Sequence, residues 1–171
     1  MMKIYYSVIE LPTGRALAVM SDKGLMWLAL RPPTVKRFVR EVKSQYGAEP
    51  LMDDKKFAAL KSELAKYFRG ERVKFKIKLD VRGTEFQKKV WASLMKIPYG
   101  DVRSYKWIAE QIKNPKAARA VGGALGANPV PIVVPCHRVV NSGGGIGGYG
   151  AGVDIKKKLL EVEGELPGRK R

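Results

Sequence analysis

The stretch Val130-Pro131-Ile132-Val133-Val134-Pro135-Cys136-His137-Arg138-Val139 places the only cysteine of the chain directly beside its only histidine. An apolar run precedes the pair and a glycine-rich segment follows it, which predicts a strand that delivers a thiol to a loop. A thiolate is a strong nucleophile, and a neighbouring imidazole is a common means of removing the thiol proton. A lone cysteine is more often a small buried apolar residue. The surrounding residues must therefore decide between a nucleophile and a core residue.

Those residues carry a specific resemblance. Pro135 favours an extended Val134 and removes a backbone donor, which suits a strand that stops abruptly. Together with Asn128-Pro129-Val130-Pro131, the run Pro135-Cys136-His137-Arg138-Val139-Val140 resembles the active-site signature of the O6-alkylguanine-DNA alkyltransferases. The resemblance extends over residues 84–164 without an obvious gap.

Length and composition set the limits of the fold. The chain has 171 residues, of which 45% are hydrophobic, enough for one large or two small domains with an apolar core. A single cysteine excludes an intramolecular disulfide, and with a single histidine it leaves too few ligands for a zinc site. We expect no metal, no cofactor, a reducing cytoplasmic location and a monomer.

The charge of the chain favours a polyanionic partner. Lys and Arg number 33 against 16 Asp and Glu, a net charge of +17, which predicts salt-sensitive nucleic-acid binding. A lysine-rich surface is also typical of thermophilic proteins, so charge supports DNA without proving it. The start of the chain lacks the apolar core of a signal peptide, and the longest uncharged stretch, 120–136, contains prolines and is too short to span a bilayer. We expect a soluble protein with no membrane partner.

The first half of the chain predicts an α/β domain over residues 1–79. Strands are expected at 2–9, 16–20 and 25–30, because turn sequences separate these apolar runs. Two amphipathic helices follow, one around 35–42 and one around 57–68 that stops at Gly70. Residues 73–79 alternate apolar and lysine side chains, which predicts a half-solvated strand.

The second half predicts a mainly helical domain over residues 80–171. Thr84-Glu85-Phe86-Gln87 is a capping box that opens a helix ending at Pro98-Tyr99-Gly100. Ser104 can cap a short helix over 105–112. Asn114-Pro115 predicts the start of another helix, with asparagine as N-cap and proline at the first helical position. Two short helices joined by a tight turn suggest a helix-turn-helix.

The helix expected over 115–125 has almost no bulky side chains and two adjacent glycines. Small side chains permit close approach of the backbone to another helix or to DNA. Lys116 and Arg119 occur there without an acidic residue, which favours DNA. The resemblance implies that this helix enters the minor groove and that Arg119 fills the space left by a flipped nucleotide. On the residues alone, a phosphate-binding arginine is a serious alternative, and the resemblance decides against it. The DNA-contacting residues that the resemblance implies are Ser104, Lys116, Ala118, Arg119 and Gly122.

The resemblance implies an N-terminal α/β domain that is ribonuclease-H-like, with a mostly antiparallel sheet and helices, and a mainly α C-terminal domain with a winged-helix-like helix-turn-helix. The implied function is direct DNA repair: irreversible, single-turnover transfer of the alkyl group from O6-alkylguanine in double-stranded DNA to Cys136. The enzyme class is methylated-DNA–protein-cysteine methyltransferase, and O4-alkylthymine is a second candidate substrate. Because the base lies inside the stack, the nucleotide must be flipped out.

The resemblance also assigns the site. Cys136 is the nucleophile, His137 accepts its proton through a water, and Glu163 orients the imidazole. Asn128 joins two segments by hydrogen bonds near Cys136, in a structural or a catalytic role. The Tyr105 hydroxyl donates to guanine N3. The backbone carbonyls of Cys136 and Val139 read the guanine amino group. The base-binding residues are Tyr105, Val139, Tyr149 and Gly150, with Tyr149 packing on the base and the Gly150 amide facing O6.

Three alternatives remain beside this interpretation. A non-catalytic sensor of alkylated bases has the same fold, but the resemblance implies that such proteins lack the nucleophile. A cysteine hydrolase with a triad of Cys136, His137 and Asn128 is disfavoured, because successive residues of an extended chain point opposite ways. The loop 143–150 fits the register G-x-G-x-x-G, but too few residues follow Gly150 for a dinucleotide-binding unit. We expect its glycines to adopt positive φ angles instead.

Overall fold

The computed structural model describes residues 2–164 and divides into two compact units between Arg82 and Gly83. The division lies beyond the expected boundary after Leu79, because that part of the chain is bonded to the first unit. Leu79 forms a parallel bridge with Leu25, and the Asp80 N–H donates to the Leu25 carbonyl at 2.8 Å. The first unit therefore includes the whole connecting segment.

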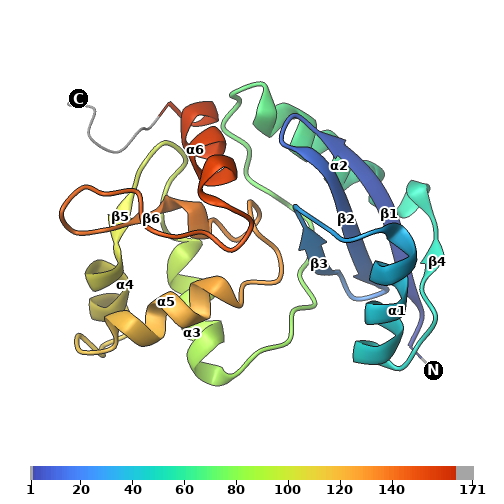
Figure 1. The fold of residues 1–171 in the computed structure, drawn as a ribbon, viewed down its shortest axis with the longest axis horizontal. Coiled ribbons are helices and arrows are strands. Elements are labelled where there is room, and N and C mark those ends of the chain that lie inside the picture. Colours follow the sequence, from blue (N-terminus) through green and yellow to red (C-terminus); the bar gives the residue numbers. More distant parts are fainter. Residues whose placement is uncertain (1, 165–171) are drawn as a thin grey trace. The chain divides into compact units, whose positions relative to one another are not determined.

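The first unit is built on a mixed sheet in the order β3-β2-β1-β4 (Figure 1). Its strands are β1 (Ile4–Leu11), β2 (Gly14–Ser21), β3 (Leu25–Ala29) and β4 (Leu51–Met52). β1 and β2 pair antiparallel, as do β2 and β3, whereas β4 pairs parallel to β1. The strands β1 to β3 fall where the apolar runs predict them, and the short strand β4 was not expected.

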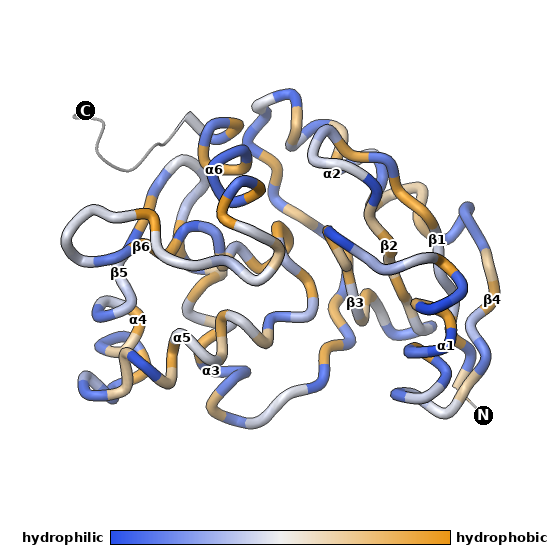
Figure 2. Tube along the Cα trace, in the orientation of Figure 1, coloured by the Kyte–Doolittle hydropathy of each residue, from blue (hydrophilic) through white to orange (hydrophobic). Residues whose placement is uncertain are grey.

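Two helices accompany this sheet, α1 (Val35–Tyr46) and α2 (Ala58–Phe68), with a 3₁₀ turn η1 (Asp54–Phe57) before the second. The Thr34 hydroxyl accepts from the Arg37 N–H at the start of α1, and Gly47 ends that helix in the left-handed conformation at φ 70°. Phe38 and Val42 of α1 are buried in one apolar core with residues of the sheet. These are Ile4, Leu17, Val19 and Met26. The apolar stretches of β2 stand out in Figure 2. Burial of this face holds the helix on the sheet.

The strand predicted for residues 73–79 does not form. The segment keeps the expected alternation, with Lys74, Lys76 and Lys78 exposed, but its regular pairing is limited to the bridge at Leu79. Its backbone is bonded elsewhere, since the Lys76 N–H donates to the Glu63 carboxylate at 2.9 Å. An alternating pattern predicts which side faces the core but does not supply a partner strand.

The second unit is mainly helical. Its elements are α3 (Glu85–Leu94), β5 (Arg103–Ser104), α4 (Tyr105–Gln111), α5 (Ala118–Gly126), η2 (Cys136–Arg138), β6 (Val139–Val140) and α6 (Val153–Val162). α5 packs against both α3 and α4 (Figure 1). The Trp91 indole N–H of α3 donates to the Ala124 carbonyl of α5 at 2.9 Å. β5 and β6 pair in parallel and join the start of α4 to the end of η2. The predicted capping box at Thr84 and the Ser104 cap are both present.

The strand predicted for residues 130–134 is a compact turn. The Val134 N–H donates to the Val130 carbonyl at 2.9 Å, and Ile132 lies in the left-handed region at φ 72°. Pro131 and Pro135 lack N–H groups, which disfavours a ladder along this segment. Cys136 is therefore presented by a turn and a 3₁₀ helix rather than by a strand end.

The helix start predicted at Asn114-Pro115 is wrong as well. α5 begins at Ala118 with Ala117 as its N-cap residue. The Ala117 N–H donates to the Asn114 carbonyl at 3.0 Å, so Asn114-Pro115 opens a turn before the helix. Asparagine at the first position and proline at the second position of a β-turn are as favourable as at a helix start. Lys116 consequently lies in the connection between α4 and α5.

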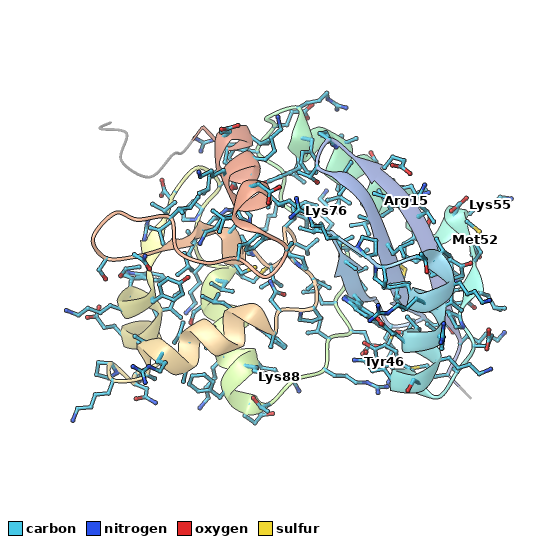
Figure 3. The ribbon with its side chains drawn as sticks, viewed as in Figure 1. Arg15, Tyr46, Met52, Lys55, Lys76 and Lys88 are labelled. Atoms are coloured by element: carbon cyan, nitrogen blue, oxygen red, sulfur yellow. The ribbon has the colours of Figure 1, made fainter. Side chains whose placement is uncertain are left out.

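No helix within residues 2–164 is both long and apolar enough to cross a membrane. Met52 is 57% exposed on β4, at the edge of the sheet, and is labelled in Figure 3. Because β4 is only two residues long, it offers little backbone for pairing with another chain.

The capping box predicts an unequal pair of substitutions. Thr84→Ala removes the bond that Thr84 Oγ1 accepts from the Gln87 N–H at 3.1 Å, and it leaves the backbone N–H of residue 84, which donates to Gln87 Oε1 at 2.9 Å, without its reciprocal partner. We expect a loss of about 1 kcal/mol in the free energy of unfolding, measured by urea denaturation. The control Thr34→Ala, whose cap has a single bond at 3.3 Å, should cost less. An equal or larger loss at Thr34 would contradict the reciprocal cap.

Candidate active site and DNA interface

Cys136 lies at a cavity of about 230 Å³ in the second unit. Helices α4 and α5 and the loop after β6 contribute its other lining residues, which are Tyr105, Gly122, Leu125, Gly126, Gly148, Tyr149 and Gly150. Four of these are glycines, so much of the wall is backbone. The structure thus brings Cys136, Tyr105, Tyr149 and Gly150 of the predicted site to one cavity. Gly122, predicted as a DNA contact, lines it too.

His137 is fully buried behind the cysteine and bonded to the end of α6. Its Nε2 lies 2.6 Å from Glu163 Oε2. Because an ionised carboxylate only accepts hydrogen bonds, the proton of the neutral imidazole lies on Nε2, and Nδ1 is its basic nitrogen. The contact between His137 and Glu163 that the resemblance implies is therefore present.

The second oxygen of Glu163 is bound by Arg138, a residue that the motif contains but sequence reasoning left without a role. Arg138 Nε donates to Glu163 Oε1 at 2.7 Å, and its Nη2 also contacts that oxygen. Arg138 Nη1 donates to the Ile97 carbonyl at 2.7 Å, and the guanidinium lies over the Tyr99 ring. The sequence signal that could have indicated a role for Arg138 is its position directly after His137 in the motif.

Asn128 holds the turn that presents the cysteine. Its Nδ2 donates to the Val134 carbonyl at 2.8 Å, and its Oδ1 accepts from the Val130 N–H at 3.0 Å. The side chain therefore supplies the pairing that a neighbouring strand would have given to the proline-containing segment. Asn128 also opposes the rise that burial causes in the pKa of the Cys136 thiol.

Burial governs the protonation of the cysteine and the histidine. It raises the pKa of the Cys136 thiol, against the opposing effect of hydrogen bonds from Asn128 and Tyr149 and the charge of Lys156. Burial also lowers the pKa of His137, against its bond to Glu163. Both shifts favour a neutral thiol beside a neutral imidazole in the resting site. Such a pair can move a proton when the sulfur attacks.

Glu163 stays ionised in spite of its burial. Burial alone raises the pKa of a carboxyl group, but hydrogen bonds and charges from His137 and Arg138 outweigh it and hold the pKa of Glu163 below its usual value. For Tyr105, burial raises the pKa, followed by the effect of Cys136, so the phenol remains a donor.

Lys156 is a second buried cation that sequence reasoning missed. Its side chain lies on α6 and donates to the Val139 carbonyl at 2.6 Å and to the Gly148 carbonyl at 3.1 Å. Burial lowers its pKa to about 8. A lysine in a charged run, Lys156-Lys157-Lys158, is indistinguishable from its exposed neighbours in sequence. Here it ties the glycine-rich loop to β6.

The glycine-rich loop follows β6 and is drawn pale in Figure 2, as its composition requires. Within 143–150, positive φ angles occur at Gly144 and Gly147, but not at Gly148 or Gly150. A Cβ atom at Gly147 would lie 3.0 Å from the Tyr105 hydroxyl and 3.4 Å from Lys156 Nζ. The expectation of positive φ angles therefore holds for part of the loop. Gly150, whose amide was expected to face the base, does not have a positive φ angle.

The remaining predicted residues lie on or beside the helix pair. Arg119 is exposed in the first turn of α5, Ala118 is half-buried before it, and Lys116 is exposed in the preceding connection. Ser104 caps α4 by accepting from the Trp107 N–H at 3.0 Å. The Val139 carbonyl, expected to read the base, accepts from Lys156 Nζ at 2.6 Å, and a carbonyl oxygen has a second lone pair.

Comparison with known proteins agrees with this geometry. Residues 85–165 match the family model described as the DNA-binding domain of 6-O-methylguanine DNA methyltransferase, and residues 4–81 match its ribonuclease-like domain. A methylated-DNA–protein-cysteine methyltransferase of Methanosarcina acetivorans is 41% identical over 162 residues, which cover 94% of this chain and 99% of that protein. The chain belongs to the 6-O-methylguanine DNA methyltransferase family.

Other members of the methyltransferase family support the assignment. A protein of that name from Mycolicibacterium paratuberculosis is 49% identical over 148 residues, covering 84% of this chain and 88% of the relative. The crystal structure of Mycobacterium tuberculosis OGT in complex with DNA superposes with a TM-score of 0.81 at 39% identity, covering 94% of this chain and 93% of that one. The enzyme from Pyrococcus kodakaraensis superposes at 0.68 with 27% identity, covering 94% and 99%.

The buried ammonium of Lys156 predicts a pH-dependent contribution to stability. Since its pKa in the folded chain is about 8, below the ordinary 10.5, the unfolded chain binds this proton more tightly and folding gains as the pH rises between these values. Lys156→Met should therefore destabilise the protein by about 1 kcal/mol more at pH 9.5 than at pH 7, measured by urea denaturation.

Lys157→Met is the matched control, because Lys157 is exposed on the same helix. Its effect on the free energy of unfolding should not change between the two pH values. A Lys156→Met cost that is constant with pH would show that the ammonium is not destabilised by its burial.

Proposed function

We propose that this protein repairs DNA by transferring the alkyl group of O6-alkylguanine to Cys136. The observation that carries the proposal is the cysteine at a cavity walled by backbone and two tyrosines, with a buried histidine–carboxylate pair behind it. Family membership supplies the reaction class, and the cysteine that a non-catalytic sensor would lack is present. DNA appears in the structure of the Mycobacterium tuberculosis relative, which supports DNA as the partner.

The residues of the site divide the work of one displacement. The Cys136 sulfur forms a bond to the alkyl carbon while the bond from that carbon to guanine O6 breaks, leaving its electron pair on the base. The thiol proton passes to His137 Nδ1 through a water, and Glu163 stabilises the imidazolium through Nε2. Tyr105 donates its hydroxyl proton toward guanine N3, which offsets the charge on the departing base.

The cavity is suited to a flat base held by backbone groups. Asn128 fixes the turn before the cysteine, and Tyr149 packs on one face of the base. The Gly150 amide donates to O6, and the Cys136 and Val139 carbonyls accept from the amino group that distinguishes guanine from adenine. A thioether is a poor leaving group and the chain has no second cysteine, so each chain reacts once.

DNA binding is assigned to the α4–α5 pair as a helix-turn-helix in a winged-helix-like domain. α5 carries Arg119 at its exposed start, and the next turns contain Gly122 and Gly123, whose lack of side chains allows close approach to the minor groove. Arg119 enters the stack in place of the flipped nucleotide. Ser104, Lys116 and Ala118 contact the phosphate backbone. The N-terminal unit, ribonuclease-H-like in this proposal, supports this domain.

Mass spectrometry tests the reaction directly. After incubation with duplex DNA containing O6-methylguanine, we expect a mass gain that corresponds to replacing one thiol hydrogen by one methyl group, mapped to Cys136. Cys136→Ser should show no gain while keeping its DNA affinity, because phosphate contacts come from other residues. Modification elsewhere, or more than one equivalent transferred per chain, would reject the proposal.

The role of Arg119 is tested by two substrates. Arg119→Ala should slow the single-turnover reaction with duplex O6-methylguanine about 100-fold, yet change the rate with free O6-benzylguanine less than about 2-fold, because a free base needs no extrusion. Lys116→Ala is the matched control: it should weaken duplex binding but not the rate at saturating protein. Equal slowing of both substrates by Arg119→Ala would indicate a damaged cavity instead.

A further inference from the structure

The carboxylate of Glu163 is shared between two side chains from the same short helix. His137 takes Oε2 and Arg138 takes Oε1, and all three side chains are buried. Proton transfer from Cys136 uses the histidine and the carboxylate but does not require the guanidinium. Burying an arginine is costly unless its charge is compensated. Arg138 lies beside the proton acceptor, where its charge can affect the protonation of the imidazole.

Burial is the main cause of the lowered pKa of His137, and the charges around the imidazole oppose one another. Glu163 at the end of α6 favours the imidazolium, whereas Arg138 in η2 and Lys156 in α6 oppose it. Cys136 is the neighbouring titratable group in η2, and the segment after α3 contributes the uncharged Ile97 carbonyl, which Arg138 binds. An imidazole beside a lone buried carboxylate would bind a proton strongly. Beside a carboxylate already paired with a guanidinium, it faces a much weaker net charge.

We propose that Arg138 is a positioning residue that neutralises Glu163 and thereby keeps His137 an unprotonated base, ready to accept the Cys136 proton. The fork of the guanidinium also fixes the carboxylate, since Nε and Nη2 both contact Oε1 while Nη1 is held by Ile97. This inference rests on the proposed function for its role in the reaction, but the protonation of His137 is measurable without any substrate.

The single histidine of the chain makes that measurement direct. Imidazole nitrogen and carbon shifts in a pH titration by nuclear magnetic resonance report His137 alone. Arg138→Gln, which keeps amide donors but loses the charge, should raise the histidine midpoint by at least about one unit. Glu163→Gln, which leaves the guanidinium beside the imidazole, should lower it below that of the unmodified protein. The double variant should fall between them.

Arg138→Lys is the matched control, because it retains the charge and loses only the fork. Its midpoint should stay within about 0.3 units of the unmodified protein, well under the shift expected for loss of the charge. The single-turnover rate with free O6-benzylguanine should follow the same pattern. Arg138→Gln should react about 10-fold more slowly at one pH unit below its new midpoint than at a pH well above it.

Several outcomes would overturn the inference. These are an unchanged histidine midpoint in Arg138→Gln, a midpoint in the double variant as high as in Arg138→Gln, or a rate that falls by the same factor at every pH. If Arg138→Gln does not fold, the opposite shift expected for Glu163→Gln still decides the matter, since an unchanged or raised midpoint there rejects the balance of charges. Loss of alkyl transfer in the unmodified protein would refute the function and leave the titration result standing.

Discussion

The second unit depends on the hydrogen bonds that the buried carboxylate of Glu163 accepts from His137 and Arg138. This carboxylate joins the end of α6 to η2 through His137 and Arg138, and Arg138 continues the connection to the Ile97 carbonyl beyond α3. A single ionised group at this depth would be strongly unfavourable, and two hydrogen-bonded partners make it tolerable. The same contacts that hold three segments together also set the proton affinity of the imidazole.

The proline-containing turn before Cys136 shows how the structure solves a backbone problem with a side chain. Prolines at positions 129, 131 and 135 remove donors, and Ile132 adopts a left-handed conformation that costs about 1 kcal/mol or more for a β-branched residue. Asn128 offsets part of this cost by bonding both the Val130 N–H and the Val134 carbonyl. Strain of this kind persists where the surrounding contacts determine it, which is the case at the site of a reactive thiol.

The wall of the cavity beside Cys136 has few side chains. Glycines from α5 and from the loop after β6 form much of it, so the wall is backbone with few obstructing atoms. Such a loop would be mobile by composition alone, and Lys156 opposes this by bonding carbonyls of both the loop and β6. A buried ammonium without partners and a glycine-rich loop without anchoring contacts are each unfavourable for the folded state. Here the loop carbonyl accepts a hydrogen bond from the ammonium, and the ammonium anchors the loop.

Local signals in the amino-acid sequence are sufficient to predict several elements of the fold. The strands β1 to β3, the amphipathic helices, the Thr84 capping box and the Cys136-His137 motif were all legible, because apolar periodicity and caps involve residues close together in the chain. Local signals failed where two structures satisfy them equally. Asn114-Pro115 opens a turn rather than a helix, and residues 73–79 and 130–134 alternate or run apolar without a strand partner.

The arrangement of charges in the site depends on the packing of segments that are distant in the chain. Arg138 and Lys156 look like surface cations in sequence, and their burial depends on carbonyl and carboxylate groups contributed by distant segments. Glu163 is likewise one carboxylate among several until the fold places it 2.6 Å from the imidazole. The physical reason is that burial and pairing of a charge are properties of the packed environment, which no short stretch of sequence contains.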